Sequence, residues 1–169
     1  MNTALASLPL RLPAAAWTLL GAVIATALDL TFAAIYWELA GSSSTRVMQA
    51  IAAYWGWGRD AYAGGMATAV LGMALFFGRM ILLAALYRIA ARPYPALIER
   101  PYLWGALFGL AVFLTNHYLV VPLIASMPPS TAPTDWLWQC SCAVAHMVLI
   151  GVPLALSARI AIAAADSER

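Results

Sequence analysis

Three ionisable side chains lie in three separate apolar stretches of this chain of 169 residues. They are Asp29, His117 and His146. Placing an acid or a cation at the centre of a bilayer costs about 2.5–3.5 kcal/mol on insertion scales, so such residues usually face the interior of a helix bundle and serve a purpose. These three residues are therefore the candidate functional groups.

Helix geometry places the three groups at one depth. At about 1.5 Å of rise per residue, their distances from the outer helix ends that we predict are roughly 15 Å for Asp29 below Leu39, 12 Å for His117 below Ala125 and 15 Å for His146 below Trp136. Half of a hydrocarbon core of about 30 Å is a similar distance. Asn116 adds an amide at this depth, and Thr26 adds a hydroxyl one turn before Asp29.

This polar layer allows several kinds of chemistry. The simplest is structural, since interhelical hydrogen bonds can fix the register of the helices. A second is a proton or cation relay through Asp29, His117 and His146, because intramembrane acids and histidines are the usual components of such relays. Asn116 and Thr26 would line the same path.

A third alternative is ligation of a haem or a metal ion. His117 and His146 could supply both axial ligands of a b-type haem, or they could join Asp29 in a site with two histidines and one carboxylate. Cys142 precedes His146 by one helical turn and offers a further soft ligand. The sequence leaves these alternatives open.

The composition defines the environment in which this layer must work. The chain is 64% hydrophobic and 9% charged, and its mean hydropathy is +0.83. A membrane-crossing helix needs about 20 mostly apolar residues. Four stretches qualify: residues 14–39, 63–89, 102–125 and 136–160. We expect an all-α, polytopic membrane protein in which residues 1–169 form a single four-helix transmembrane domain.

The arginines predict the orientation of this domain, because cytoplasmic loops retain positive charge. One side of the predicted membrane carries Arg11, Arg88, Arg92, Arg100, Arg159 and Arg169, and the other side carries Arg46 and Arg59. We therefore expect both termini in the cytoplasm. Arg79 lies within an apolar stretch, and we expect its side chain to extend toward the cytoplasmic surface. The exclusive use of Arg and the alanine-rich composition indicate a GC-rich bacterial genome.

The connections also have recognisable patterns. Residues 45–55 follow a cap-like run of Ser and Thr and have apolar residues at helical spacing, which predicts a short interfacial helix at the outer surface. The prolines of the inner connection, residues 90–101, predict a turn that a helix cannot traverse. Pro128, Pro129 and Pro133 predict an extended outer turn, while Pro122 and Pro153 predict bends within helices.

Small residues indicate where the helices approach one another, since helices in a bilayer associate through close backbone contact. Gly105 and Gly109 form a GxxxG step, and Gly65 and Gly72 mark a similar face on another helix. These faces could pack within one subunit or hold a homo-oligomer together. Because four helices rarely enclose a pore alone, we expect an oligomer or a subunit of a larger membrane complex in the lipid bilayer.

The second half of the chain resembles a known family. The residues that carry the likeness are the run from Tyr87 to Pro93, then Gly105, Asn116, His117, Pro122, Leu123, Pro128, Pro129, His146 and Arg159. This pattern is similar to that of YagU-type bacterial inner-membrane proteins. The resemblance implies a four-helix inner-membrane architecture and a role for His117 and His146, but it implies no reaction.

Several functional classes receive no support. The sequence contains no glycine-rich nucleotide loop, no GxSxG elbow and no HExxH helix, so an enzymatic role is not indicated. The net charge of +2 indicates no nucleic-acid partner. We therefore predict a membrane protein whose buried Asp and His residues handle a proton or a small cation. The alternatives are a haem-binding or metal-binding redox subunit and an accessory subunit without chemistry.

Overall fold

The four apolar stretches form four long helical segments. A computed structural model describes residues 12–124 and 135–167, and within these residues it contains helices and connecting turns but no strand. The segments long and apolar enough to cross a membrane, here called the first to fourth spans, are Ala14–Leu39, Gly65–Ala91, Pro101–Ile124 and Trp136–Asp166. These spans indicate a membrane protein, as the composition predicts.

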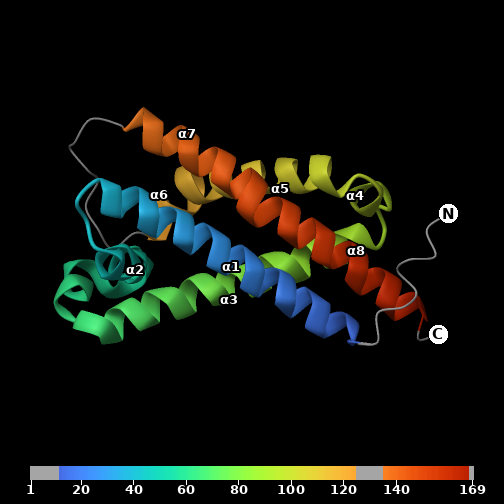
Figure 1. Ribbon diagram of the computed structural model, residues 1–169, viewed down its shortest axis with the longest axis horizontal. Helices are drawn as coiled ribbons and strands as arrows, with labels where there is room; N and C mark the ends of the chain where they lie inside the picture. The colour runs from blue at the N-terminus through green and yellow to red at the C-terminus, as the bar shows by residue number, and fades with distance from the viewer. Residues whose placement is uncertain (1–11, 125–134, 168–169) are drawn as a thin grey trace.

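The first two spans are uninterrupted helices, whereas the third and fourth each contain a π-helical turn. The elements of the spans are α1 (Ala14–Leu39), α3 (Gly65–Ala91), α5 (Pro101–Thr115), η4 (Asn116–Val120), α6 (Val121–Ile124), α7 (Trp136–Ala145), η5 (His146–Gly151) and α8 (Val152–Ser167). The connecting elements are α2 (Ser44–Ala52), η2 (Ala53–Trp57), η3 (Gly58–Ala63) and α4 (Ala96–Glu99). Figure 1 shows α2, α6 and the start of α7 at one end of the bundle and α4 at the other.

The hydrophobic core lies where α1, α3 and the fourth span meet. Small side chains of α1 pack there against larger ones of α3 and α8. The buried members of this core include Ala22, Ala25, Phe76, Met80, Ile150 and Leu154. Since alanines allow close approach of helix backbones in a bilayer, this arrangement brings α1 near both neighbours.

The two π turns of the spans each end two residues before a proline. The backbone N–H of Val121 donates to the carbonyl of Asn116, and that of Val152 donates to the carbonyl of Met147. Pro122 and Pro153 follow, and a proline has no N–H to donate to the carbonyl four residues earlier. The helix widens by one residue at each position instead of breaking, a form often found at functional sites.

The connection at the α2 end begins as predicted but is shorter. The Ser43 side chain accepts a hydrogen bond from the Arg46 N–H at 3.3 Å, which caps α2. The helix was expected to extend to residue 55, but it ends at Ala52 in a π turn where Trp55 and Gly56 leave helical conformation. Gly56 has a φ of 122°, which favours glycine. The position of α2 at a membrane interface stays a prediction.

The connection at the α4 end differs from the expected turn. It contains one turn of helix, α4, which follows Pro95, and Pro101 is the first residue of α5. Prolines fit these places because the first turn of a helix leaves its N–H groups unpaired. The fourth span also continues past residue 160, since the alanine-rich segment that follows has a high helix propensity. The predicted outer turn, residues 126–134, and the predicted helix end at Ala125 lie outside the described residues.

Candidate functional site

Two of the three predicted groups lie side by side. The Nδ1 atom of His146 is 3.8 Å from the Oδ1 atom of Asp29. The two residues are 9% and 6% exposed, and they come from η5 and α1. The sequence therefore correctly places an acid and an imidazole from separate spans together in the interior.

The hydrogen bond of His146 determines its tautomer. Its Nδ1 lies 2.9 Å from the carbonyl oxygen of Cys142, one turn earlier in the same span. A carbonyl can only accept, so Nδ1 carries the proton and donates it. The Nε2 atom of the neutral ring is then left with a lone pair that can accept a second proton.

The hydrogen bonding of the Asp29 carboxylate is incomplete. Its Oδ1 atom is buried and has no hydrogen-bond partner among the described residues. A buried polar atom without a partner is costly, and a charged one is more so. Because Oδ1 is also the atom nearest to His146, a small movement of either side chain would allow a proton to be shared between them.

Arg79 belongs to the same centre, which the sequence analysis did not recognise. Its guanidinium charge interacts with both Asp29 and His146. The guanidinium carbon lies 5.9 Å from the ring centre of Phe76, three residues earlier on α3. The side chain thus extends back along α3 toward the α2 end, as helical side chains tend to do. The side chain was expected to extend in the opposite direction along α3, toward the α4 end, and that direction is wrong. The position of Arg79 near the middle of a 27-residue helix was the available signal.

His117 lies in a neighbouring position and not in the ion pair itself. Its ring stacks on Phe113 at 5.7 Å between centroids and packs edge-on against Tyr118 at 4.7 Å. Phe113 also contacts the ring of His146, at 5.5 Å between centroids. One phenyl ring thus connects the two imidazoles, while Asp29 contacts His146 directly.

The two neutral polar residues have local partners. Thr26 donates its hydroxyl hydrogen to the carbonyl of Ala22 at 2.7 Å, within its own helix. Asn116 is half-buried and begins η4, where its carbonyl accepts from Val121. Neither residue has a hydrogen bond to Asp29 among those that the structure describes. Their expected place in a relay rests on depth alone.

The metal alternative gains no support from the described residues. Within 12–124 and 135–167 there is no group of three or more His, Cys, Asp or Glu side chains that could hold a metal ion. Cys142 contacts His146 through its carbonyl, and its half-buried thiol and that of Cys140 are both free. Ligation of a b-type haem by His117 and His146 stays a prediction.

Three of the four glycines predicted to mark helix contacts pack within the subunit. A Cβ atom on Gly109 would meet the backbone carbonyl of His146, and one on Gly105 would meet that of Gly151. A Cβ atom on Gly72 would meet the carbonyl of Met48 in α2. Gly65 is the exception: a Cβ atom there would meet no heavy atom within 4 Å, and its φ of 59° suits a glycine at the start of α3. The GxxxG face of the third span is thus covered by the fourth span of the same chain.

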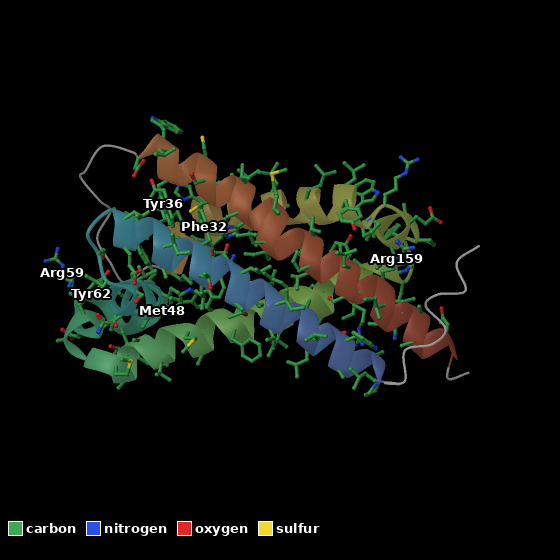
Figure 2. All side chains as sticks on the ribbon, in the orientation of Figure 1. Phe32, Tyr36, Met48, Arg59, Tyr62 and Arg159 are labelled. Atoms are coloured by element: carbon green, nitrogen blue, oxygen red, sulfur yellow. The ribbon has the colours of Figure 1, made fainter. Side chains whose placement is uncertain are left out.

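An aromatic cluster covers the pair on the side of the α2 end. Phe32 and Tyr36 follow Asp29 on the same side of α1, and both rings pack against Trp138 of α7, at 6.0 and 4.6 Å between centroids. Tyr36 donates its hydroxyl to Asp135 at 3.4 Å. Figure 2 shows Phe32 and Tyr36 between α1 and α7. These rings join α1 to α7 between the pair and that end of the bundle.

The centre therefore consists of a carboxylate, an imidazole and a guanidinium from three spans. Each of these three side chains can carry a charge or a proton, and each lies near the middle of an apolar helix. Comparison of the chain with protein-family models, with curated proteins and with solved structures finds no match.

Proposed function

We propose that this membrane protein binds and releases a proton at the Asp29–His146 pair in the interior of its helix bundle. The observation that carries the proposal is the buried Oδ1 atom of Asp29, which has no donor among the described residues and lies 3.8 Å from Nδ1 of His146. Acids and histidines inside membrane spans are the usual components of proton relays, so the pair is suited to reversible protonation.

Charge balance supports a single exchanged proton. With a neutral His146, the charges of Asp29 and Arg79 cancel. A proton that binds at Nε2 converts His146 to an imidazolium beside the Asp29 carboxylate. Opposite charges attract strongly in an interior of low polarity, so the carboxylate stabilises this state.

Proton movement into proteoliposomes tests this proposal. A potassium diffusion potential drives protons, and an enclosed pH-sensitive dye reports their entry. Asp29→Asn removes the carboxylate charge, and we expect it to slow proton entry at least tenfold. Asp60→Asn makes the same chemical change at an exposed residue outside the spans and should leave the rate unchanged. Equal rates for both variants and the unaltered protein would refute the relay.

A second candidate function is structural, and the origin of the three charged groups favours it. Asp29, Arg79 and His146 come from three different spans, so their interactions join α1, α3 and η5. Polar contacts between membrane helices contribute about 0.6 kcal/mol on average. Under this alternative, Asp29→Asn lowers the unfolding free energy, while neither the unaltered protein nor the variant carries protons.

We further propose that the protein acts in the bacterial inner membrane as a homo-oligomer or as a subunit of a larger complex. The arginine distribution and the resemblance to YagU-type proteins support this location. Since the Gly105 and Gly109 face is covered within the subunit, an oligomer would have to use other lipid-facing surfaces. Light scattering of the purified protein in nanodiscs measures the oligomeric mass, and a monomeric mass would exclude the homo-oligomer.

A further inference from the structure

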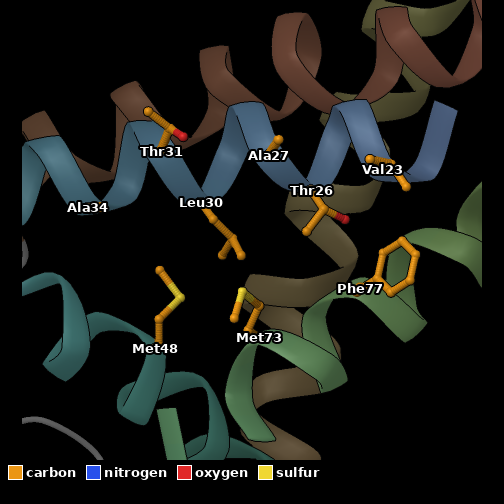
Figure 3. Close-up of a pocket in the computed structure, with 9 residues that line it drawn as sticks. All are labelled: Val23, Thr26, Ala27, Leu30, Thr31, Ala34, Met48, Met73 and Phe77. Atoms are coloured by element: carbon orange, nitrogen blue, oxygen red, sulfur yellow. The ribbon is translucent and has the colours of Figure 1, made fainter. Parts of the chain in front are cut away.

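A groove lies between α1, α2 and α3, on a different side of α1 from His146. Its volume is about 420 Å³, which is within the range of about 300–1,000 Å³ usual for ligand pockets. Figure 3 shows Leu30, Met48 and Met73 converging on it from the three helices. Other lining residues are Val23, Ala27, Ala34 and Phe77.

The groove has the length of one leaflet of a bilayer. On α1 it runs from Val23 to Ala34, which is about 16 Å of helix axis at about 1.5 Å per residue. This is about half of a hydrocarbon core of about 30 Å. Both ends of this run lie within the first span, with Asp29 near its middle, so the groove has about the length that one acyl chain spans in a leaflet.

The polarity of the lining changes along the groove. Its walls are almost entirely apolar, and the hydroxyl hydrogen of Thr26 is already donated to Ala22. Toward the α2 end, a second hollow of about 160 Å³ shares Met48 and Met73 with the groove. That hollow is also lined by Ser44 and Thr45, whose hydroxyls can donate to an ester or a phosphate oxygen.

We propose that this groove is a binding site for one acyl chain of a membrane phospholipid. The apolar walls accept the chain, the flexible thioethers of Met48 and Met73 adapt to it, and Ser44 and Thr45 hydrogen-bond the polar part of the same molecule. Three features carry the assignment: the groove lies on a lipid-facing side of the spans, it has the length of one leaflet, and its polarity increases in the order found along a phospholipid. The site is independent of proton binding at the Asp29–His146 pair.

Native mass spectrometry of the full chain released from phosphatidylglycerol and phosphatidylethanolamine nanodiscs tests the site. Ala27→Phe fills the groove with a phenyl ring. Ala111→Phe makes the same change at another exposed alanine, on α5 away from the groove. We expect one phospholipid to remain on the unaltered chain and on Ala111→Phe, and its occupancy to fall at least tenfold on Ala27→Phe. Equal retention by all three chains would overturn the proposal.

A second measurement requires no substitution. A phospholipid with a photoreactive diazirine at its chain end is incorporated with the unaltered protein, and the labelled residues are identified after illumination. We expect labelling to concentrate on Met48, Met73 and Phe77. Uniform labelling of the lipid-facing residues of all spans would overturn the proposal. So would a dimeric mass that Ala27→Phe converts to a monomer, because a second copy of the chain would then occupy the groove.

Discussion

At the scale of single residues, glycines determine how the third and fourth spans meet. Gly109 faces the backbone carbonyl of His146, and Gly105 and Gly151 face each other. A side chain at any of these positions would meet backbone atoms, which cannot rotate away. The position of the His146 backbone, and with it the position of the imidazole, therefore depends on the absence of a Cβ atom at Gly109.

Gly109→Ala should destabilise the protein by about 1–3 kcal/mol, as overpacking of a filled interior usually does. The matched control is Gly78→Ala, because a Cβ atom at Gly78 meets no heavy atom within 4 Å. The control should be neutral or stabilising by up to about 1 kcal/mol through helix propensity. Unfolding in mixed micelles with increasing dodecyl sulfate, followed by circular dichroism, measures both. Equal effects of the two substitutions would contradict the packing described for Gly109.

At the scale of secondary structure elements, α7 is positioned by one residue at its start. The Oδ1 atom of Asp135 accepts a hydrogen bond from the Trp138 N–H at 3.0 Å, and its Oδ2 accepts one from Tyr36. Asp135 thus caps α7 and connects it to α1 at the aromatic cluster.

Asp135→Ala should lower the unfolding free energy by about 1 kcal/mol through loss of the cap. It should also change the near-ultraviolet circular dichroism of the aromatic cluster, because the hydrogen bonds of the Tyr36 hydroxyl and the Trp138 N–H to Asp135 are both lost. Asp135→Asn keeps an acceptor for the Trp138 N–H and should retain most of the stability. If the alanine and asparagine variants were equally stable, the cap would contribute nothing.

The elements show what the sequence can and cannot predict. In lipid every backbone group must be paired internally, so long apolar runs must be helical, and the bounds predicted for α1 are confirmed at both ends. The π turns were not predicted, because Pro122 and Pro153 indicate only a missing donor and not how the helix accommodates it. The turn of helix at α4 was excluded too strictly, since a proline at a first turn does not prevent a helix.

The candidate site could also be predicted only in part from the sequence. Depth along a span follows from residue number, which placed Asp29 and His146 together. Rotation about the helix axis and the direction of a side chain depend on neighbouring helices, so the ring stacking of His117 and the local hydrogen bond of Thr26 were not evident. Arg79 was missed because a long side chain can reach either membrane surface, and only its contact with Phe76 gives the direction.

At the scale of the whole molecule, the arginines of the described chain other than Arg79 divide between its two ends. Arg88, Arg92, Arg100 and Arg159 lie in or beside the segments that meet at the α4 end, and Arg46 and Arg59 lie in the connection at the α2 end. Figure 2 shows Arg159 and Arg59 at opposite ends of the bundle. The positive-inside rule then predicts that the α4 end faces the cytoplasm.

Reporter fusions in a bacterial host measure this orientation. Alkaline phosphatase is active only after export, so a fusion after Gly58 should be active and a fusion after Ala96 inactive. Green fluorescent protein exported in unfolded form does not fluoresce, so it should fluoresce only at Ala96. The opposite pattern at both sites would invert the predicted orientation, and matching expression of the four fusions is the control.

The glycine contact between the third and fourth spans has a consequence for motion. With no side chain between the two backbones at Gly105, Gly109 and Gly151, those spans should behave as one rigid body that carries His146. Asp29 belongs to α1, so a pivot of α1 against this body is the simplest movement that would separate the acid from the imidazole. Spin labels on α1 and α8 would report such a pivot as a change in distance with pH, whereas labels on α5 and α8 should keep a constant separation.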